Sequence, residues 1–386
     1  MPKNIKGFFK QEHAVDKIFL LLIIIVALFG LLMVYEASVV YSDIVFKSKY
    51  HYLVQQAGWM AIGFIGLFLF SRIDLNIVKK YAPYLFGISL LLLVFVLLPT
   101  PFAPAIYGAR RWIYLNPPPF PAIPIVGILG FQPSELAKFA GILFLSSYLS
   151  SAKTEAKSQL VIMRNFTIIL LVTAGLIAAQ PDFTTAFVVV ILFCSILFFN
   201  GVNIGYFLVT GPIAIGIAAI YALSSEYRRL RLMTLINPES VDSSGAGYQI
   251  KQVMIALGSG GLLGLGFGKS RQKYAYLPEV TADSIFGVVG EEFGFVGTVL
   301  LILLFILLIT RGIKIAVNSE DKFARLAATG VIVWITIQVL VNLGSMVRIL
   351  PITGIPLPLI SYGGSSTIFI LWSLGIVLNV SRKSKL

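Results

Sequence analysis

The sequence is poor in the residues on which soluble enzymes and metalloproteins depend. Only 12% of its 386 residues are charged, and it contains one cysteine and two histidines. The single Cys194 excludes an intramolecular disulfide, and no cluster of cysteine and histidine is present that would hold zinc. Because so few charges cannot cover a water-soluble domain of this length, the composition excludes that class of protein.

Long apolar runs recur along the whole chain instead, and a helix needs about 20 apolar residues to cross the hydrocarbon of a bilayer. We therefore predict an all-α polytopic membrane protein, with residues 1–386 forming one integral membrane domain. About ten transmembrane helices are expected, at 17–37, 53–70, 82–99, 131–150, 164–180, 183–200, 203–223, 285–310, 324–346 and 364–381.

The basic residues indicate the orientation. If both termini are cytoplasmic, seventeen lysines and arginines fall in the inner tails and loops and five in the short outer loops. Cytoplasmic segments normally carry this excess, so we predict both termini in the cytoplasm and relate the net charge of +13 to the membrane, not to nucleic acid. The long connection at about 224–284 is then extracytoplasmic, between helices 7 and 8. Its glycine-rich segment 250–268 is predicted to lie at the interface, not to form an eleventh span.

Carboxylates gather at the end of this loop, in the stretch YLPEVTADSIFGVVGEE. Glu279 and Asp283 precede the eighth span, and a carboxylate at the boundary of water and lipid can be tuned as a general base. A second interpretation is that Asp283 only caps the helix that begins near Ser284. Glu291 and Glu292 fall near the helix start, where the helix dipole tolerates them, which favours a structural role.

Other charges lie near the outer ends of the spans. Glu135 and Lys138 are three residues apart and are expected to pair, whereas Asp182 has no local partner and is either functional or part of an interhelical ion pair. Arg110 and Arg111 either anchor a span end or bind a lipid phosphate or pyrophosphate.

Between the last two spans, the segment LPITGIPLPLISYGGSS at 350–366 is rich in proline, glycine and hydroxyl residues. Irregular backbone is tolerated at membrane depth only where protein or a polar cavity surrounds it. We therefore expect this segment to line the site.

Six motifs then appear in a fixed order: GARRWI, QPSELAK, QPDFTTA, GYQIKQVMIALGSGGLLGLGFGKSRQKYAYLPE, GEEFGFVG and LPLISYGGSS. Together they resemble the shape, elongation, division and sporulation (SEDS) family, from the first span to the last. The resemblance implies a ten-span glycosyltransferase of the bacterial cytoplasmic (inner) membrane that polymerises lipid II into peptidoglycan on the outer face. It also implies a class B penicillin-binding protein transpeptidase as a partner, beside other membrane proteins of division or elongation.

The catalytic residue of that family is the aspartate closing a Pro-Glu-x-His-Thr-Asp block. The matching block here is PEVTAD, so the resemblance carries the catalytic role to Asp283 and the glutamate to Glu279. Thr281 and Ala282 depart from the family's histidine and threonine, which leaves the roles of those two positions in doubt.

The predicted substrate-binding set combines cations that would face a pyrophosphate with acids and hydroxyls near the same end of the spans. Arg111 and Trp112 match the family's first extracellular motif. The set comprises Glu279, Arg110, Arg111, Trp112, Lys269, Arg271, Lys273, Glu135, Lys138, Asp182, Ser361 and Ser365. No metal site is predicted from the residues, although a divalent cation (Mg²⁺ or Mn²⁺) could assist the leaving group.

Three alternatives stay open. SRQKYAYLPE and MVYEASVVY resemble the division branch of the family, whereas LPITG with Thr353 resembles the elongation branch, and the balance favours division. A transporter moving lipid II between leaflets would use Asp182, Glu135 and Lys138 along a proton-coupled path. A noncatalytic scaffold for the transpeptidase would leave Asp283 replaceable.

Overall fold

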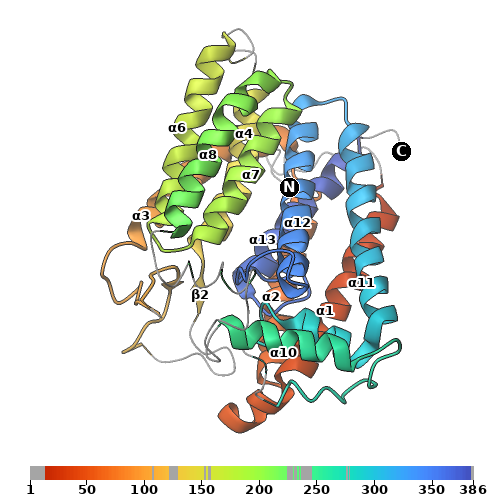
Figure 1. Cartoon of the computed structure of the whole chain (residues 1–386). Coiled ribbons are helices and arrows are strands. Elements are labelled where there is room, and N and C mark those ends of the chain that lie inside the picture. The colour runs from red at the N-terminus through yellow and green to blue at the C-terminus, as the bar shows by residue number, and fades with distance from the viewer. Residues whose placement is uncertain are drawn as a thin grey trace.

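A computed structural model describes residues 14–106, 108–120, 129–151, 154, 158–223, 229, 233, 235, 246–274, 277 and 279–383. In this part of the chain ten helices of at least 17 residues confirm the predicted all-α architecture (Figure 1). They are α1 (Lys17–Phe46), α2 (His51–Phe70), α3 (Leu75–Phe95), α4 (Pro133–Leu149), α6 (Gln159–Ala178), α7 (Phe183–Phe199), α8 (Ile204–Leu223), α11 (Ile285–Val317), α12 (Lys322–Met346) and α13 (Gly364–Ser381).

Each of these helices falls on one predicted span. Seven of them are long and apolar enough to cross a membrane on their own, and α7 is a shorter apolar helix. The predicted start of the third span at 82 is wrong, because α3 begins at Leu75, where the carboxylate of Asp74 accepts a hydrogen bond from the backbone N–H of Asn76 at 2.9 Å. The predicted end of the first span at 37 is also too early, since α1 continues to Phe46.

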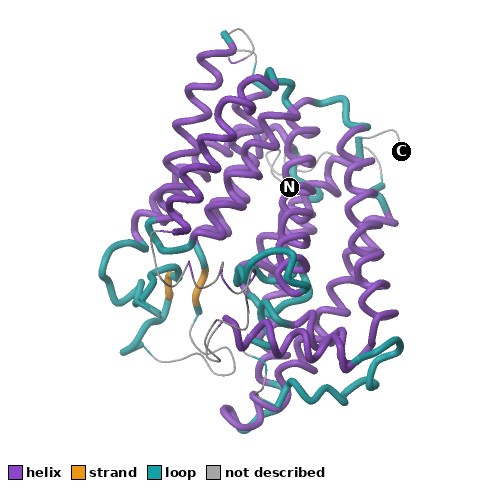
Figure 2. The backbone as a smooth tube through the Cα atoms, viewed as in Figure 1, coloured by secondary structure: helices purple, strands orange, loops and turns teal. Residues whose placement is uncertain are grey.

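The segment predicted to lie at the interface forms α10 (Ala246–Ser259) and the loop after it. Figures 1 and 2 show α10 running across the ends of the long helices instead of alongside them. The prediction that 250–268 is not an eleventh span is therefore confirmed. We call the end of the bundle that carries α10 the outer end.

The two chain ends meet at the opposite end of the bundle. The backbone N–H of Asp16, which caps α1, donates to Ser381 Oγ at the end of α13 at 3.0 Å. Both termini of the described chain therefore lie on one side, as predicted, and the positive-inside count makes it the cytoplasmic side. That residues 1–386 form a single domain stays a prediction.

The core is built around α12 and α13, which are buried along most of their length. α12 packs against α4, α7 and α11, and α13 packs most extensively against α2. A two-stranded antiparallel sheet, β1 (Ile113–Tyr114) and β2 (Gly130–Phe131), lies at the outer end beside the start of α13. This frame fixes the positions from which the outer loops are held.

The outer part of α11 is broken at Gly294, whose φ is 64°. Four backbone groups that a helix would pair with each other bond instead to the loop after α10. The carbonyls of Glu291 and Glu292 accept from Leu265 and Gly266, and the N–H groups of Phe295 and Val296 donate to Gly261 and Leu262, at 2.9–3.1 Å. These four bonds satisfy backbone groups that the break would otherwise leave unpaired, and they join α11 to the loop.

Candidate active site

Asp283 lies two residues before α11, at the outer end of the bundle, and is only 6% exposed. Its carboxylate oxygen Oδ2 is 3.4 Å from Gln249 Nε2 of α10, and the same amide donates to Ser284 Oγ at 2.7 Å. The N-cap of α11 is Ser284. The capping interpretation of Asp283 is therefore not favoured, and its carboxylate is directed towards α10 and the loop before α13.

The backbone of Asp283 is fixed by Asn342, which is fully buried in α12. Asn342 Nδ2 donates to the carbonyls of Asp283 and Ile355, each at 2.9 Å. A side chain at Gly354, whose φ is 68°, would place a Cβ 3.9 Å from Asp283 Oδ2. One amide thus clamps the start of α11 to the loop 347–363 and brings that loop against the carboxylate.

The same loop continues to the start of α13, as the sequence predicted for a segment lining the site. The backbone N–H of Tyr362 donates to the carbonyl of Thr281 at 2.8 Å. Ser361 Oγ accepts from the backbone N–H of Leu357 at 2.9 Å, and Ser365 Oγ accepts from that of Gln132 at 3.0 Å. Both serine hydroxyls are buried and hold backbone, while their predicted contact with substrate stays a prediction.

Tyr362 is held by residues of α2. Its hydroxyl donates to Gln55 Oε1 at 2.6 Å, and its ring packs edge-on against Tyr52 with centroids 5.0 Å apart. Burial, with a smaller effect from Tyr52, raises the pKa of Tyr362 to about 12. The phenol therefore stays protonated at neutral pH and acts as a hydrogen-bond donor.

Glu279 stands apart from this buried group. It is exposed, has a positive φ of 48°, and its carbonyl accepts from the N–H groups of Ala282 and Ser284 at 3.1 and 3.2 Å. This tight turn delivers Asp283 to its buried position. Its own carboxylate remains on the surface of the turn, four residues from the candidate base.

The loop before β1 brings Arg110, Arg111 and Trp112 to the same end. Arg111 Nε donates to the carbonyl of Gln180 at 3.1 Å, and its guanidinium also bonds the carbonyl of Pro181. Arg111 therefore ties this loop to the start of α7, while Arg110 and Trp112 are partly exposed.

The predicted pairing of Glu135 and Lys138 is confirmed. Lys138 Nζ lies 2.7 Å from Glu135 Oε1 and 4.9 Å from the ring centroid of Trp334, and both charges are buried. Asp182 caps α7: its Oδ1 accepts from the N–H of Thr185 at 3.3 Å, and its Oδ2 accepts from Gln132 Nε2 at 3.2 Å. Glu135 and Lys138 therefore pair within α4, and Asp182 links the start of α7 to Gln132.

Lys273 lies inside a buried ion cluster. Its Nζ is 2.9 Å from Glu36 Oε2 of α1 and 3.3 Å from Glu292 Oε1, and it also donates to the carbonyl of Gly268 at 2.8 Å. Burial opposes the charge, but the hydrogen bond to Glu36 and the charge of Glu292 outweigh it, so the pKa of Lys273 is raised. This lysine joins α1 to α11, which favours a structural role over the predicted contact with substrate.

Glu291 shares in the same joint. Its carboxylate accepts from Ser270 Oγ at 2.5 Å and from the backbone N–H groups of Arg271 and Gln272 at 3.2 and 3.3 Å. The structural interpretation of Glu291 and Glu292 agrees with these contacts. The side chains of Lys269 and Arg271 are exposed, so they are the cations of this loop that can reach a ligand.

No group of three or more His, Cys, Asp or Glu side chains is placed to hold a metal ion among the residues that the structure describes. Glu135 and Glu292 pair with lysines, Asp182 and Glu291 accept from an amide and a hydroxyl, and Glu279 is exposed. Assistance of the leaving group by Mg²⁺ or Mn²⁺ stays a prediction.

Two residues of the site were not anticipated from the sequence, Gln249 and Asn342. Gln249 stands within the quoted motif GYQIKQ, but a glutamine in an amphipathic helix has no distinguishing pattern. Asn342 is an isolated amide in an apolar span, and polar residues within spans usually have a functional reason, so this signal could have identified it.

The chain is similar to known proteins over nearly its whole length. Residues 16–386 match the family described as Cell cycle protein, which comprises FtsW, RodA and SpoVE. The chain belongs to this family. It is 36% identical to the probable peptidoglycan glycosyltransferase FtsW of Coxiella burnetii, over 92% of this chain and 93% of that one. It is also 36% identical to stage V sporulation protein E of Bacillus subtilis, over 97% and 99%.

Solved structures of the FtsW/RodA/SpoVE family agree. The rod shape determining protein RodA of Thermus thermophilus superposes with a TM-score of 0.69 at 28% identity, covering 97% of this chain and 98% of that one. A structure described as "Structural coordination of polymerization and crosslinking by a peptidoglycan synthase complex" gives 0.75 at 29% identity, covering 96% and 98%. The predicted family and membrane class are confirmed, so the chain is a multi-pass protein of the bacterial inner membrane. Relatives named FtsW agree with the predicted likeness to the division branch.

Proposed function

We propose that the chain is a peptidoglycan glycosyltransferase that polymerises lipid II on the outer face of the cytoplasmic membrane, with Asp283 as its general base. The observation that carries this proposal is the buried Asp283 carboxylate at the outer end, beside Gln249 and held through its backbone by Asn342. Relatives covering nearly the whole chain are named as probable peptidoglycan glycosyltransferases, which supports the same reaction.

In this reaction Asp283 accepts the proton of the acceptor sugar's 4-hydroxyl while the oxygen attacks the anomeric carbon of the donor. The new glycosidic bond forms as the bond to the pyrophosphate breaks, and undecaprenyl pyrophosphate leaves with the electron pair. Attack opposite the leaving group inverts the configuration. General bases of this kind typically contribute about 10²–10⁴-fold to the rate.

The leaving pyrophosphate needs positive charge placed beforehand. Lys269 and Arg271 are exposed on the loop that joins α10 to Asp283, and Arg110 is partly exposed on the loop before β1. These three cations are our candidates for that role. Arg111 and Lys273 are not among them, because each holds an outer loop to another part of the chain.

A membrane-bound transpeptidase of the class B penicillin-binding type is the proposed partner, because the matched synthase complex couples polymerisation to crosslinking. The transporter alternative is weaker. It relied on Glu135, Lys138 and Asp182, and these residues are engaged in an ion pair and a helix cap at the outer end.

The test uses the purified chain in liposomes that carry labelled lipid II in the outer leaflet. We expect the wild type to produce glycan strands on a gel, and Asp283→Asn to bind lipid II without producing any. Asp43→Asn, which neutralises an exposed carboxylate near the outer end of α1 and outside the predicted site, is the matched control and should retain polymer. Polymer from Asp283→Asn would show that Asp283 is not the general base. Leaflet exchange without polymer from the wild type would favour the transporter.

A further inference from the structure

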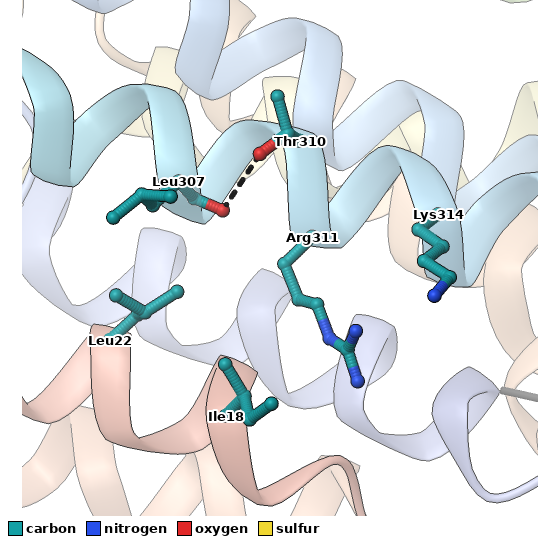
Figure 3. Close-up of a pocket in the computed structure, with 6 residues that line it drawn as sticks. All are labelled: Ile18, Leu22, Leu307, Thr310, Arg311 and Lys314. Carbon is teal, nitrogen blue, oxygen red and sulfur yellow. Dashed lines mark hydrogen bonds between the residues drawn. The ribbon is translucent and has the colours of Figure 1, made fainter.

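A groove opens between α1 and α11 at the cytoplasmic end of the bundle, far along α11 from Asp283. It has a volume of about 320 Å³ and combines apolar side chains with two cations. Its lining residues, drawn in Figure 3, are Ile18, Leu22, Leu307, Thr310, Arg311 and Lys314. The proposed glycosyl transfer at the outer end uses none of them.

The apolar part of the groove faces the lipid. Ile18 and Leu307 form exposed walls, 56% and 53% exposed, while Leu22 between the helices is nearly buried. In a chain that spans a bilayer, such a furrow is filled by a hydrocarbon chain, because only lipid tails are available at this depth. The walls alone would accept the tail of any lipid.

The cations add selectivity for the headgroup. Arg311 is fixed in place, with Nε and Nη2 at 2.9 and 2.7 Å from Asp16 Oδ2, and it remains 24% exposed on the groove. Lys314 lies one turn further along α11 and is exposed. Figure 3 shows both side chains extending from the same side of the helix. Two cations and one carboxylate leave one positive charge, which matches a single phosphodiester.

Thr310 adds a polar group between the walls and the cations. Its hydroxyl donates back to the carbonyls of Ile306 and Leu307 at 2.8 and 3.1 Å. The hydrogen is therefore used within α11, and the exposed oxygen is left to accept a hydrogen bond. A headgroup that offers a hydroxyl beside its phosphate would satisfy both Thr310 and the cations.

The spacing along α11 fits the depth of one leaflet. From Leu307 to Lys314 is seven residues, or about 10 Å of helix. The polar headgroup region on each side of the hydrocarbon is roughly 5–8 Å thick. With Lys314 among the headgroups, Leu307 therefore lies at the level of the acyl chains, and the positive-inside orientation makes this the cytoplasmic leaflet.

We propose that this groove binds one anionic glycerophospholipid of the inner leaflet, with a tail between Ile18 and Leu307 and its phosphate at Arg311 and Lys314. Basic pockets between transmembrane helices on the cytoplasmic side are suited to such headgroups. The lipid would bridge α1 and α11, the helices that Asp16 and Arg311 already connect at this end.

The test is native mass spectrometry of the purified full-length chain, offered equal amounts of phosphatidylglycerol and phosphatidylcholine with identical tails. We expect the wild type to retain one phosphatidylglycerol in preference. Lys314→Gln should reduce that preference about fivefold, the usual effect of one basic residue near the membrane surface. Lys80→Gln, which removes an exposed inner-end cation on α3, is the matched control and should change nothing.

A second pair of variants tests the apolar part. Leu307→Trp should fill the furrow and reduce retention of both lipids, whereas Ile313→Trp, on the same helix but outside the lining, should not. Equal retention of the two lipids by the wild type would overturn the proposal, as would equal effects of Lys314→Gln and Lys80→Gln. Retention only after deletion of residues 1–13 would identify the N-terminal segment as the occupant and overturn it too.

Discussion

Replacing Lys273 by methionine distinguishes a lysine that supports the fold from one that binds substrate. Methionine retains most of the aliphatic stem but leaves the carboxylates of Glu36 and Glu292, now 2.9 and 3.3 Å from the ammonium, without their cation. Removing one partner of a buried ion pair typically costs about 3–5 kcal/mol, because the remaining charge stays desolvated. We expect the free energy of unfolding to fall by about that amount.

The measurement is denaturation of the purified protein in detergent, alongside polymerisation of lipid II by the fraction that remains folded. Lys273→Met combined with Glu36→Gln removes one of the stranded charges and should recover part of the stability. Lys269→Met, on the exposed side of the same loop, should leave the free energy of unfolding nearly unchanged. If Lys273→Met melts like the wild type but no longer polymerises lipid II, the lysine acts on the substrate and our interpretation is wrong.

The same cluster makes a prediction for alkaline pH. Because the pKa of Lys273 is raised in the folded protein, its contribution to stability is fully present below the unfolded pKa of about 10.4. It is lost as the pH rises through the higher folded value. The wild type should therefore lose stability above about pH 10, and Lys273→Met should lose less over that interval.

Two further substitutions test the packing and the clamp. Gly30→Ala would place a Cβ 1.9 Å from the carbonyl oxygen of Leu359 and should destabilise by about 1–3 kcal/mol, whereas Gly58→Ala, with nothing within 4 Å, should be neutral or stabilising in thermal melts. Equal melts of the two would contradict the close approach of α1 to the loop. Asn342→Ala removes the donor to two buried carbonyls and should lower the free energy of unfolding by about 1–3 kcal/mol. It should lower kcat for lipid II more than it raises KM. An unchanged kcat would show that Asn342 does not position Asp283 for the reaction.

Much of the fold could be predicted because a span has to be apolar along its length. The sequence therefore predicted the number and order of the helices, and the glycine-rich segment around α10 as a non-spanning element. Helix ends were less predictable, because hydropathy contains no information about the hydrogen bonds that cap a helix. The first turns of α3 carry Lys79 and Lys80, which lower the hydropathy there, although the N-cap at Asp74 places both in the helix.

The site could be located from the sequence but not assembled. Asp283 was singled out by its position at the membrane boundary and by a motif, both of which are local. Its neighbours Gln249 and Asn342 are 34 and 59 residues away along the chain. Lys273 was predicted to face a pyrophosphate, since a loop lysine is normally exposed, and only the folded chain brings Glu36 to it from 237 residues away.

The joint at Gly294 determines how α11 responds to a sideways load in the bilayer. A simple kink could flex, but four backbone hydrogen bonds fasten this one to residues 261–266. Neither Gly264 nor Gly294 has room for a side chain, because each would meet the other's backbone within 2.3–2.7 Å. A change in the tilt of the lipid-embedded half of α11 therefore has to move residues 261–266 with it or break these bonds.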